Sequence, residues 1–161
     1  MIACRQEQTT GDEQMDQREC EQTGCKQEEV WEHFTRWFKW GMTTHEFWEI
    51  FFTDRRIIFA FVGETYTTFL LRGDASDRKR ESLKKAPPEA ILHANRENYA
   101  LSYGQIEQII LKRGNLLKMP CLTVKTRAGL SKSFFIDDRR YDLQKHLPVL
   151  TRLLPGKVSL R

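Results

Sequence analysis

The hydrophobic pattern of this chain changes its period within one stretch, and the change predicts three elements in a row. Residues 89–95 follow two prolines and suit a short helix, because proline is tolerated in the first helical turn. Apolar side chains then alternate over 99–103 and again over 106–111, which predicts two consecutive strands with a corner at Gly104. No residue pattern in the three elements is typical of catalysis.

Two β-hairpins are predicted on either side of this stretch. Residues 47–53 and 56–62 are rich in aromatic and β-branched side chains and are separated by only two polar residues, as in a hairpin. Residues 120–126 and 131–136 predict a second hairpin, in which Gly129 can supply a positive φ at the turn. Between the first hairpin and the short helix, the sequence predicts a charged and partly helical excursion, at about 64–95 with that helix included.

The segment before the first hairpin allows two interpretations. Val30, Phe34, Trp37 and Phe38 are spaced as on one face of a helix, yet a first strand over 35–40 fits equally well. The same region holds all the tryptophans of the chain, within eighteen residues: Trp31, Trp37, Trp40 and Trp48. Their concentration predicts that the core, or an interface, is anchored here.

A C-terminal helix is predicted at about 140–154. Leu143, Leu147, Leu150 and Leu154 form one apolar seam at helical spacing. Pro148 would cost about 3 kcal/mol inside a continuous helix, so the helix is either kinked there or restarts with the proline in its first turn. The Pro-Gly pair that follows Leu154 ends it.

Charge divides the chain of 161 residues into two parts. Residues 1–29 hold eight acidic and three basic residues, a net charge of −5, and almost no large apolar side chains, which predicts a disordered acidic tail. Since the whole chain carries +4, residues 30–161 carry +9 and are predicted to form one basic domain. No apolar run approaches the roughly 18 residues of a membrane span, and the four cysteines suggest no disulfide framework, so a cytoplasmic location is expected.

Candidate chemistry is sparse, and we expect neither an enzyme nor a resident metal or cofactor. The four histidines are scattered without partners at metal-ligand spacing: His33, His45, His93 and His146. The sequence contains no glycine-rich phosphate loop, nucleophile elbow or zinc-protease motif.

Basic residues are the principal binding candidates. They would form a patch for anionic headgroups if the fold brought them together, each contributing about 1 kcal/mol near an acidic surface; the alternative is an ordinary solvated surface. The candidates are Arg55, Arg56, Arg78, Lys79, Arg80, Lys84, Lys85, Lys112 and Arg113, with Lys118 at the same turn as the last two and Arg139 and Arg140 before the C-terminal helix. Trp31, Trp37 and Trp40 are candidates for a membrane or protein interface, although core packing is the expected role for most of them.

The order of these elements resembles the pleckstrin-homology-like (PH-like) superfamily, which includes GRAM-like domains, and is closest to its uncharacterised bacterial and archaeal members. The resemblance covers roughly 47–158 and rests on the segments 48–59, 88–92, 98–103, 106–111, 122–124, 134–136 and 150–158. It implies a mainly β fold: a partly open antiparallel barrel of six or seven strands, with the helical excursion between the second and third strands and a C-terminal capping helix. Pro148 and the ambiguous segment near Trp37 depart from the pattern.

Together these observations predict a non-catalytic binding or adaptor module. Its expected partner is an anionic membrane surface, at the inner face of the membrane, contacted through basic loops. The alternative is a protein-interaction or self-assembly module that uses the barrel edge and the tryptophan-rich segment. Salt should weaken the first kind of binding and spare the second. Nucleic-acid binding ranks third, because the aromatic residues do not alternate with the later basic groups.

Overall fold

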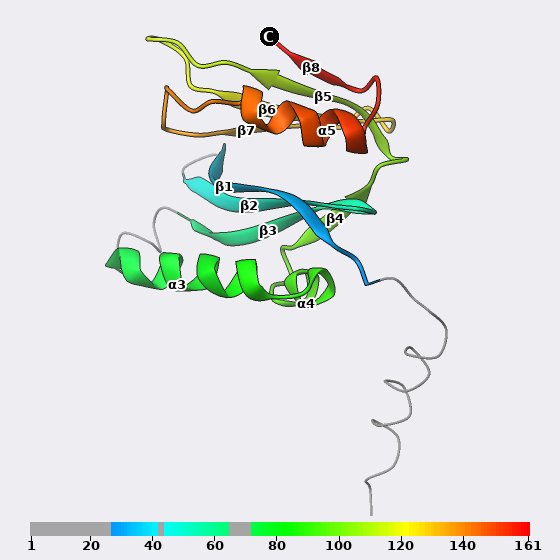
Figure 1. Ribbon diagram of the computed structural model, residues 1–161. Helices are drawn as coiled ribbons and strands as arrows, with labels where there is room; N and C mark the ends of the chain where they lie inside the picture. Colours follow the sequence, from blue (N-terminus) through cyan, green and yellow to red (C-terminus); the bar gives the residue numbers. More distant parts are fainter. Residues whose placement is uncertain (1–26, 42–43, 65–71) are drawn as a thin grey trace, which may run out of the picture.

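The computed structural model describes residues 27–41, 44–64 and 72–161, with the side chains of the first helix described from Asp77 onward (Figure 1). The predicted disordered tail lies, apart from its last three residues, outside the described residues. The elements in chain order are β1 (Val30–Trp40), β2 (His45–Thr53), β3 (Arg56–Glu64), α3 (Arg72–Lys85), α4 (Pro88–His93), β4 (Tyr99–Ser102), β5 (Ile106–Lys112), β6 (Cys121–Thr126), β7 (Ser131–Phe135), the 3₁₀ turn η1 (Gln144–His146), α5 (Leu147–Leu153) and β8 (Val158–Leu160).

The described strands form one open, mixed sheet in the order β4-β3-β2-β1-β7-β6-β5-β8. All neighbours are antiparallel except β5 and β8, which run parallel. The structure therefore corrects the prediction of an antiparallel barrel with six or seven strands. The additional strand, β8, begins at Val158, the last residue of the segment 150–158 that the PH-like resemblance assigned to the closing helix. Gly156, with a φ of 73°, reverses the chain there so that Val158 pairs beside Ile109.

The sheet folds over on itself so that its two halves, β1–β4 and β5–β8, face each other (Figure 1). The halves are joined by a narrow seam, since β1 and β7 pair only at Phe38 and Phe135. The main core fills the space between them and includes fully buried side chains from both halves, among them Ile50, Phe59 and Leu111. Away from the seam, η1 and α5 pack against the main core, and the side chains of Leu143 and Leu150 form part of it.

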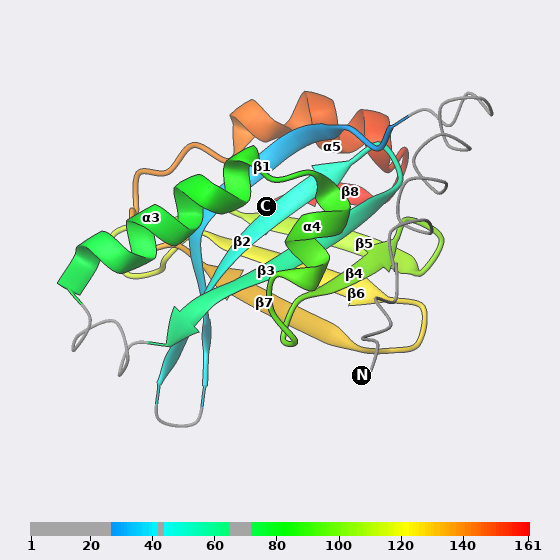
Figure 2. The same ribbon diagram turned by 90° about the horizontal axis from the view of Figure 1, so that it is seen from below.

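Helices α3 and α4 cover the outer face of the β1–β4 half, as Figure 2 shows from below. Leu83 and Ile91 pack there against Phe51 and Ile58 in a second core cluster. Asn98 fixes α4 to β3, because its side chain accepts a hydrogen bond from Phe61 N at 2.7 Å and donates one to the carbonyl of Ile91 at 2.6 Å. The described part of the predicted excursion is thus largely helical, but it lies between β3 and β4 because β1 precedes the first hairpin.

The ambiguous tryptophan-rich segment is a strand with a β-bulge. Phe34 pairs with Ile50 and Trp37 pairs with Trp48, so three steps along β1 match two along β2. Arg36 takes up the extra residue with a φ of 62°, in the left-handed region. The bulge lets Phe34 and Trp37 both face the main core, which an even strand would forbid. The helix-like spacing of the apolar residues in this segment is therefore explained by a bulged strand.

A buried carboxylate holds this bulge in place. Glu49 is fully buried on β2, and its oxygens contact His33 Nε2 at 2.7 Å, Thr35 Oγ1 at 3.1 Å, Arg36 N at 2.9 Å and Arg80 Nε at 3.0 Å. Burial alone would raise the pKa of Glu49, but the hydrogen bonds from His33, Arg36 and Thr35 outweigh it and hold the pKa below its usual value. One ionised side chain thus joins β1, β2 and α3.

Most of the remaining element predictions are confirmed. Both hairpins form as predicted, and Gly129 has a φ of 80° in the second. The C-terminal helix predicted at about 140–154 is shorter and is divided at Leu147 into η1 and α5. Pro148 lies in the first turn of α5, so the helix restarts there, where the absent N–H of proline breaks no hydrogen bond.

Replacing Glu49 by Gln should destabilise the domain by about 3 kcal/mol, because the largely buried Arg80 would keep only the exposed Asp77 as a counter-charge. Urea unfolding followed by tryptophan fluorescence measures the change. Glu81→Gln is the matched control on the exposed face of α3 and should leave the midpoint unchanged. Equal midpoints for the two variants would show that Glu49 does not hold the fold together.

Candidate functional site

The loop between β5 and β6 presents two leucines to solvent. Leu116 and Leu117 have 88% and 90% of their surface exposed. Asn115 builds the turn that carries them: its side-chain oxygen accepts hydrogen bonds from Leu117 N at 2.9 Å and from Lys118 N at 2.8 Å, and its own N–H donates to the Lys118 carbonyl at 2.8 Å. The exposure of the leucines is therefore fixed by a hydrogen-bonded turn.

Close packing holds the base of this loop against the segment before η1. A Cβ atom on Gly114 would lie 2.7 Å from both the Arg139 carbonyl oxygen and Pro120 Cδ, so only glycine fits. The Arg139 guanidinium donates a hydrogen bond to the carbonyl of Leu116. Arg139 is thereby placed beside the exposed leucines.

Basic and aromatic side chains surround the leucines. A hollow of about 450 Å³ lies at the base of the loop, and its lining includes Leu117, Met119, Trp40, Phe135, Lys112, Arg113 and Lys118. Trp40 is 55% exposed and lies 6.4 Å from Phe135 between ring centroids. We call the surface formed by Trp40, Lys112, Arg113, Leu116, Leu117, Lys118, Phe135 and Arg139 the basic-apolar face.

The structure thus brings together only part of the predicted basic set. Lys112 and Arg113 lie on the basic-apolar face with Trp40. Arg113 donates one hydrogen bond to Gln144 Oε1 at 3.1 Å, and Lys112 is exposed at the end of β5. Two exposed leucines complete this face, and they were not among the candidates predicted from the sequence.

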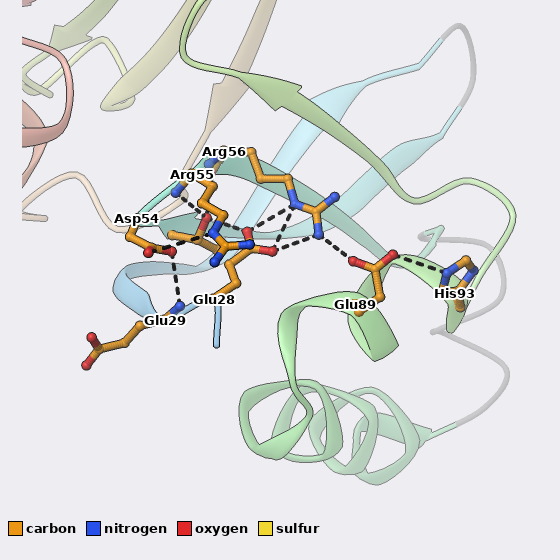
Figure 3. Close-up of polar contacts among 8 residues, drawn as sticks. Glu28, Glu29, Asp54, Arg55, Arg56, Glu89 and His93 are labelled. Carbon is orange, nitrogen blue, oxygen red and sulfur yellow. Dashed lines mark hydrogen bonds and ion pairs between the residues drawn. The ribbon is translucent and has the colours of Figure 1, made fainter. Parts of the chain in front are cut away.

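The basic pair at the first hairpin turn lies among acidic side chains (Figure 3). Arg56 binds Glu28 through Nη2 at 2.7 Å and also contacts Glu89, and these hydrogen bonds raise the pKa of Arg56. Asp54 accepts a hydrogen bond from Glu29 N at 3.1 Å and lies 3.9 Å from Arg55 Nε. Arg55 and Arg56 therefore do not form an uncompensated cationic patch.

Three basic residues of α3, Lys79, Arg80 and Lys84, are also compensated or turned inward. Arg80 contacts Glu49 and Asp77, and Lys84 contacts Glu81 at 2.9 Å. The remaining predicted residues on this helix are Arg78, Lys79 and Lys85. Lys79 Nζ donates to the Val62 carbonyl at 2.9 Å, and burial lowers the pKa of Lys79. Arg78 and Lys85 are exposed and line a shallow hollow together with Asp77 and Glu81.

The three interface tryptophans have different environments. Trp37 is fully buried in the main core, so in this fold it does not offer a contact surface. Trp31 is partly buried, and the guanidinium carbon of Arg152 lies 4.5 Å from its ring centroid. Trp40 alone among the three is exposed by more than half.

A polar cluster lies where η1 packs on β1. His146 is 4% exposed; its Nε2 lies 2.8 Å from the Tyr141 hydroxyl, and its Nδ1 lies 3.0 Å from Glu32 Oε2 without hydrogen-bond alignment. Its ring also packs 4.2 Å from that of Phe34. Burial lowers the pKa of His146 although the Glu32 carboxylate opposes the shift. Such burial suits a structural role in attaching the C-terminal segment.

Two further findings concern metals and membranes. Among the described residues, no three His, Cys, Asp or Glu side chains gather as metal binding would require. Within the same ranges, every helix is too short or too polar to span a bilayer.

Comparison with known proteins gives little guidance. No protein-family model matches the chain, and no curated protein matches it. Among solved structures, the chain is similar to the C-terminal domain of an unknown protein from Leishmania infantum, with a TM-score of 0.47 and 11% sequence identity over 89% of this chain and 99% of that one.

The buried imidazole predicts a pH dependence of stability. The pKa of His146 is lower in the folded protein than in the unfolded chain, so the unfolded chain takes up a proton at a higher pH. The free energy of unfolding should therefore fall as the pH drops below about 6.5, and should stop falling once the pH is below the pKa of His146 in the folded protein. His146→Gln should flatten this dependence in urea titrations across that range. His93→Gln removes an exposed imidazole and should leave the pH dependence of the unfolding free energy unchanged. An equal pH dependence in both variants would contradict its assignment to His146.

Proposed function

We propose that this chain is a non-catalytic, PH-like binding module that docks on an anionic membrane surface through the basic-apolar face. The observation that carries the proposal is the pair of exposed leucines, held by a fixed turn and flanked by Lys112, Arg113, Lys118 and Arg139. Exposed apolar side chains beside cations suit the boundary between headgroups and acyl chains, where both kinds of group are satisfied.

The expected energies support a combined mechanism. Each basic residue near an acidic surface contributes about 1 kcal/mol. Each leucine that enters the acyl boundary contributes about 1.5–3 kcal/mol by leaving water. Salt screens the first contribution and spares the second, so binding should weaken with salt without vanishing. Trp40, with its exposed ring on the same face, fits the headgroup layer.

The PH-like assignment rests on the arrangement of elements. Two facing halves of a mainly β sheet, joined by a corner between β4 and β5 and closed on one side by a C-terminal helix, are compatible with it. The open sheet and the parallel strand β8 are departures from the expected barrel. Under this proposal the protein would lie in the cytoplasm and bind peripherally at the inner face of the membrane.

A protein partner or a second copy of this chain is the alternative occupant of this surface. Trp40, Phe38, His45 and Phe135 form a compact aromatic group at the seam between the halves, of the kind that anchors protein interfaces. The net charge of the surrounding lysines and arginines favours the membrane.

Co-sedimentation with vesicles tests the proposal, with phosphatidylcholine alone compared with phosphatidylcholine containing phosphatidylserine, at low and moderate salt. The wild type should bind the anionic vesicles selectively. Leu116→Ser/Leu117→Ser should weaken binding about a hundredfold or more, because two leucine contributions are lost, and should remove the salt-resistant part. Lys112→Glu/Lys118→Glu should weaken it by a similar factor at low salt.

Lys84→Glu/Lys85→Glu is the matched control, because it makes the same change in net charge at the end of α3. It should retain most of the binding. Equal losses in the two lysine variants would mean that binding follows net charge and has no defined face. Absence of binding to every vesicle would reject the membrane proposal and leave the protein-interface alternative.

A further inference from the structure

A second cavity lies on the other side of the seam between the two halves. It has a volume of about 610 Å³, and its lining includes Lys39, Glu46, Trp48, Phe61, Tyr99 and Lys132. Neighbouring residues on β1 and β7 alternate between the two hollows: Lys39 and Lys132 line this cavity, while Trp40 and Ser133 line the hollow at the basic-apolar face. The cavity is therefore separate from the proposed membrane contact.

One wall of the cavity is aromatic. The ring of Trp48 lies 5.3 Å from that of Phe61 and 5.7 Å from that of Tyr99, edge-on in both cases. The reverse side of this wall is fixed by the core, because Phe59 stacks on Tyr99 at 4.7 Å. Such a wall presents ring faces and ring edges in a rigid frame, which suits an aromatic ligand.

A lysine ammonium lies directly against this wall. Lys132 Nζ is 3.8 Å from the centroid of the Tyr99 ring. Among the described residues, no carboxylate lies within ion-pair distance of Lys132 Nζ. The carboxylate of Glu46, on the same cavity, binds Lys39 Nζ at 3.1 Å instead and accepts a hydrogen bond from Trp48 Nε1 at 3.3 Å. Lys132 thus holds a partly buried ammonium against a ring face, and the Glu46 carboxylate attracts it only from beyond ion-pair distance.

This arrangement is electrostatically incomplete. Burial, with a smaller contribution from the neighbouring Lys39, lowers the pKa of Lys132, and the more distant Glu46 carboxylate only partly opposes this shift. A bound anion would supply the missing charge and would gain a charge-assisted hydrogen bond in a partly desolvated site. The remaining lining residues, Glu64, Asn95, Arg96 and Glu97, are polar, which disfavours a long acyl chain and favours a compact ligand with a polar end.

From these contacts we infer that the cavity binds a small aromatic carboxylate, with its carboxylate on Lys132 Nζ and its ring against Trp48 and Phe61. The inference is independent of membrane docking, because it uses neither the leucines nor the basic residues of the basic-apolar face.

Calorimetric titration with indole-3-acetate and with indole-3-acetamide tests the inference, since the two probes share a ring and differ in charge. The carboxylate should bind wild-type protein at least tenfold more tightly than the amide. Lys132→Met should abolish this preference, and Lys132→Arg, which retains the cation, should keep a measurable part of it.

Lys125→Met on the adjacent strand β6 is the matched control and should bind like the wild type. Thermal unfolding of each variant, together with binding by Lys132→Arg, separates loss of the site from loss of the fold. Equal affinity for the two probes, no binding of either, or equal loss in Lys125→Met would overturn the inference.

Discussion

The carboxylate of Glu49 is the constraint on which the arrangement of this domain depends. A fully buried charge is costly unless donors surround it, and here the donors come from a bulged backbone, a histidine, a threonine and an arginine. Arg36 can adopt its left-handed conformation because its N–H has this fixed acceptor. The same carboxylate holds α3 against the sheet through Arg80, so strand geometry and helix position are coupled through one side chain.

The bulge has a consequence at the far end of β1. Because the bulge adds one residue to the strand, each side chain after it points to the face of the sheet opposite the one it would occupy in an unbulged strand. Trp37 and Lys39 therefore lie on one face of the strand, toward the main core and the second cavity, while Phe38 and Trp40 lie on the opposite face. Without the bulge, the tryptophan of the basic-apolar face and the lysine of the second cavity would exchange sides. Both proposed sites thus depend on a polar contact in the middle of the strand.

Local patterns in the sequence predict much of this fold. The alternation over 106–111 specifies a strand, and the turn at Gly129 specifies a hairpin. Both can be read from the sequence because each depends only on residues that are neighbours in the chain. The bulge at Arg36 and strand β8 were not predictable in the same way. The first depends on Glu49 reaching across from β2, and the second on pairing with β5, which precedes it by many residues. Both are tertiary effects that override local propensity.

The candidate site shows the same limit for charges. A run of basic residues on α3 appears in the sequence as a cationic patch, but a helix brings Lys84 beside Glu81, and tertiary packing brings Arg80 onto Glu49. Arg56 likewise binds Glu28, from the segment predicted to be a tail. The basic residues of the β5–β6 loop have a different environment, since that loop packs on Arg139 and projects two leucines. The availability of a cation for a partner is therefore decided by which carboxylates the fold places near it, and the number of basic residues in a segment does not reveal this.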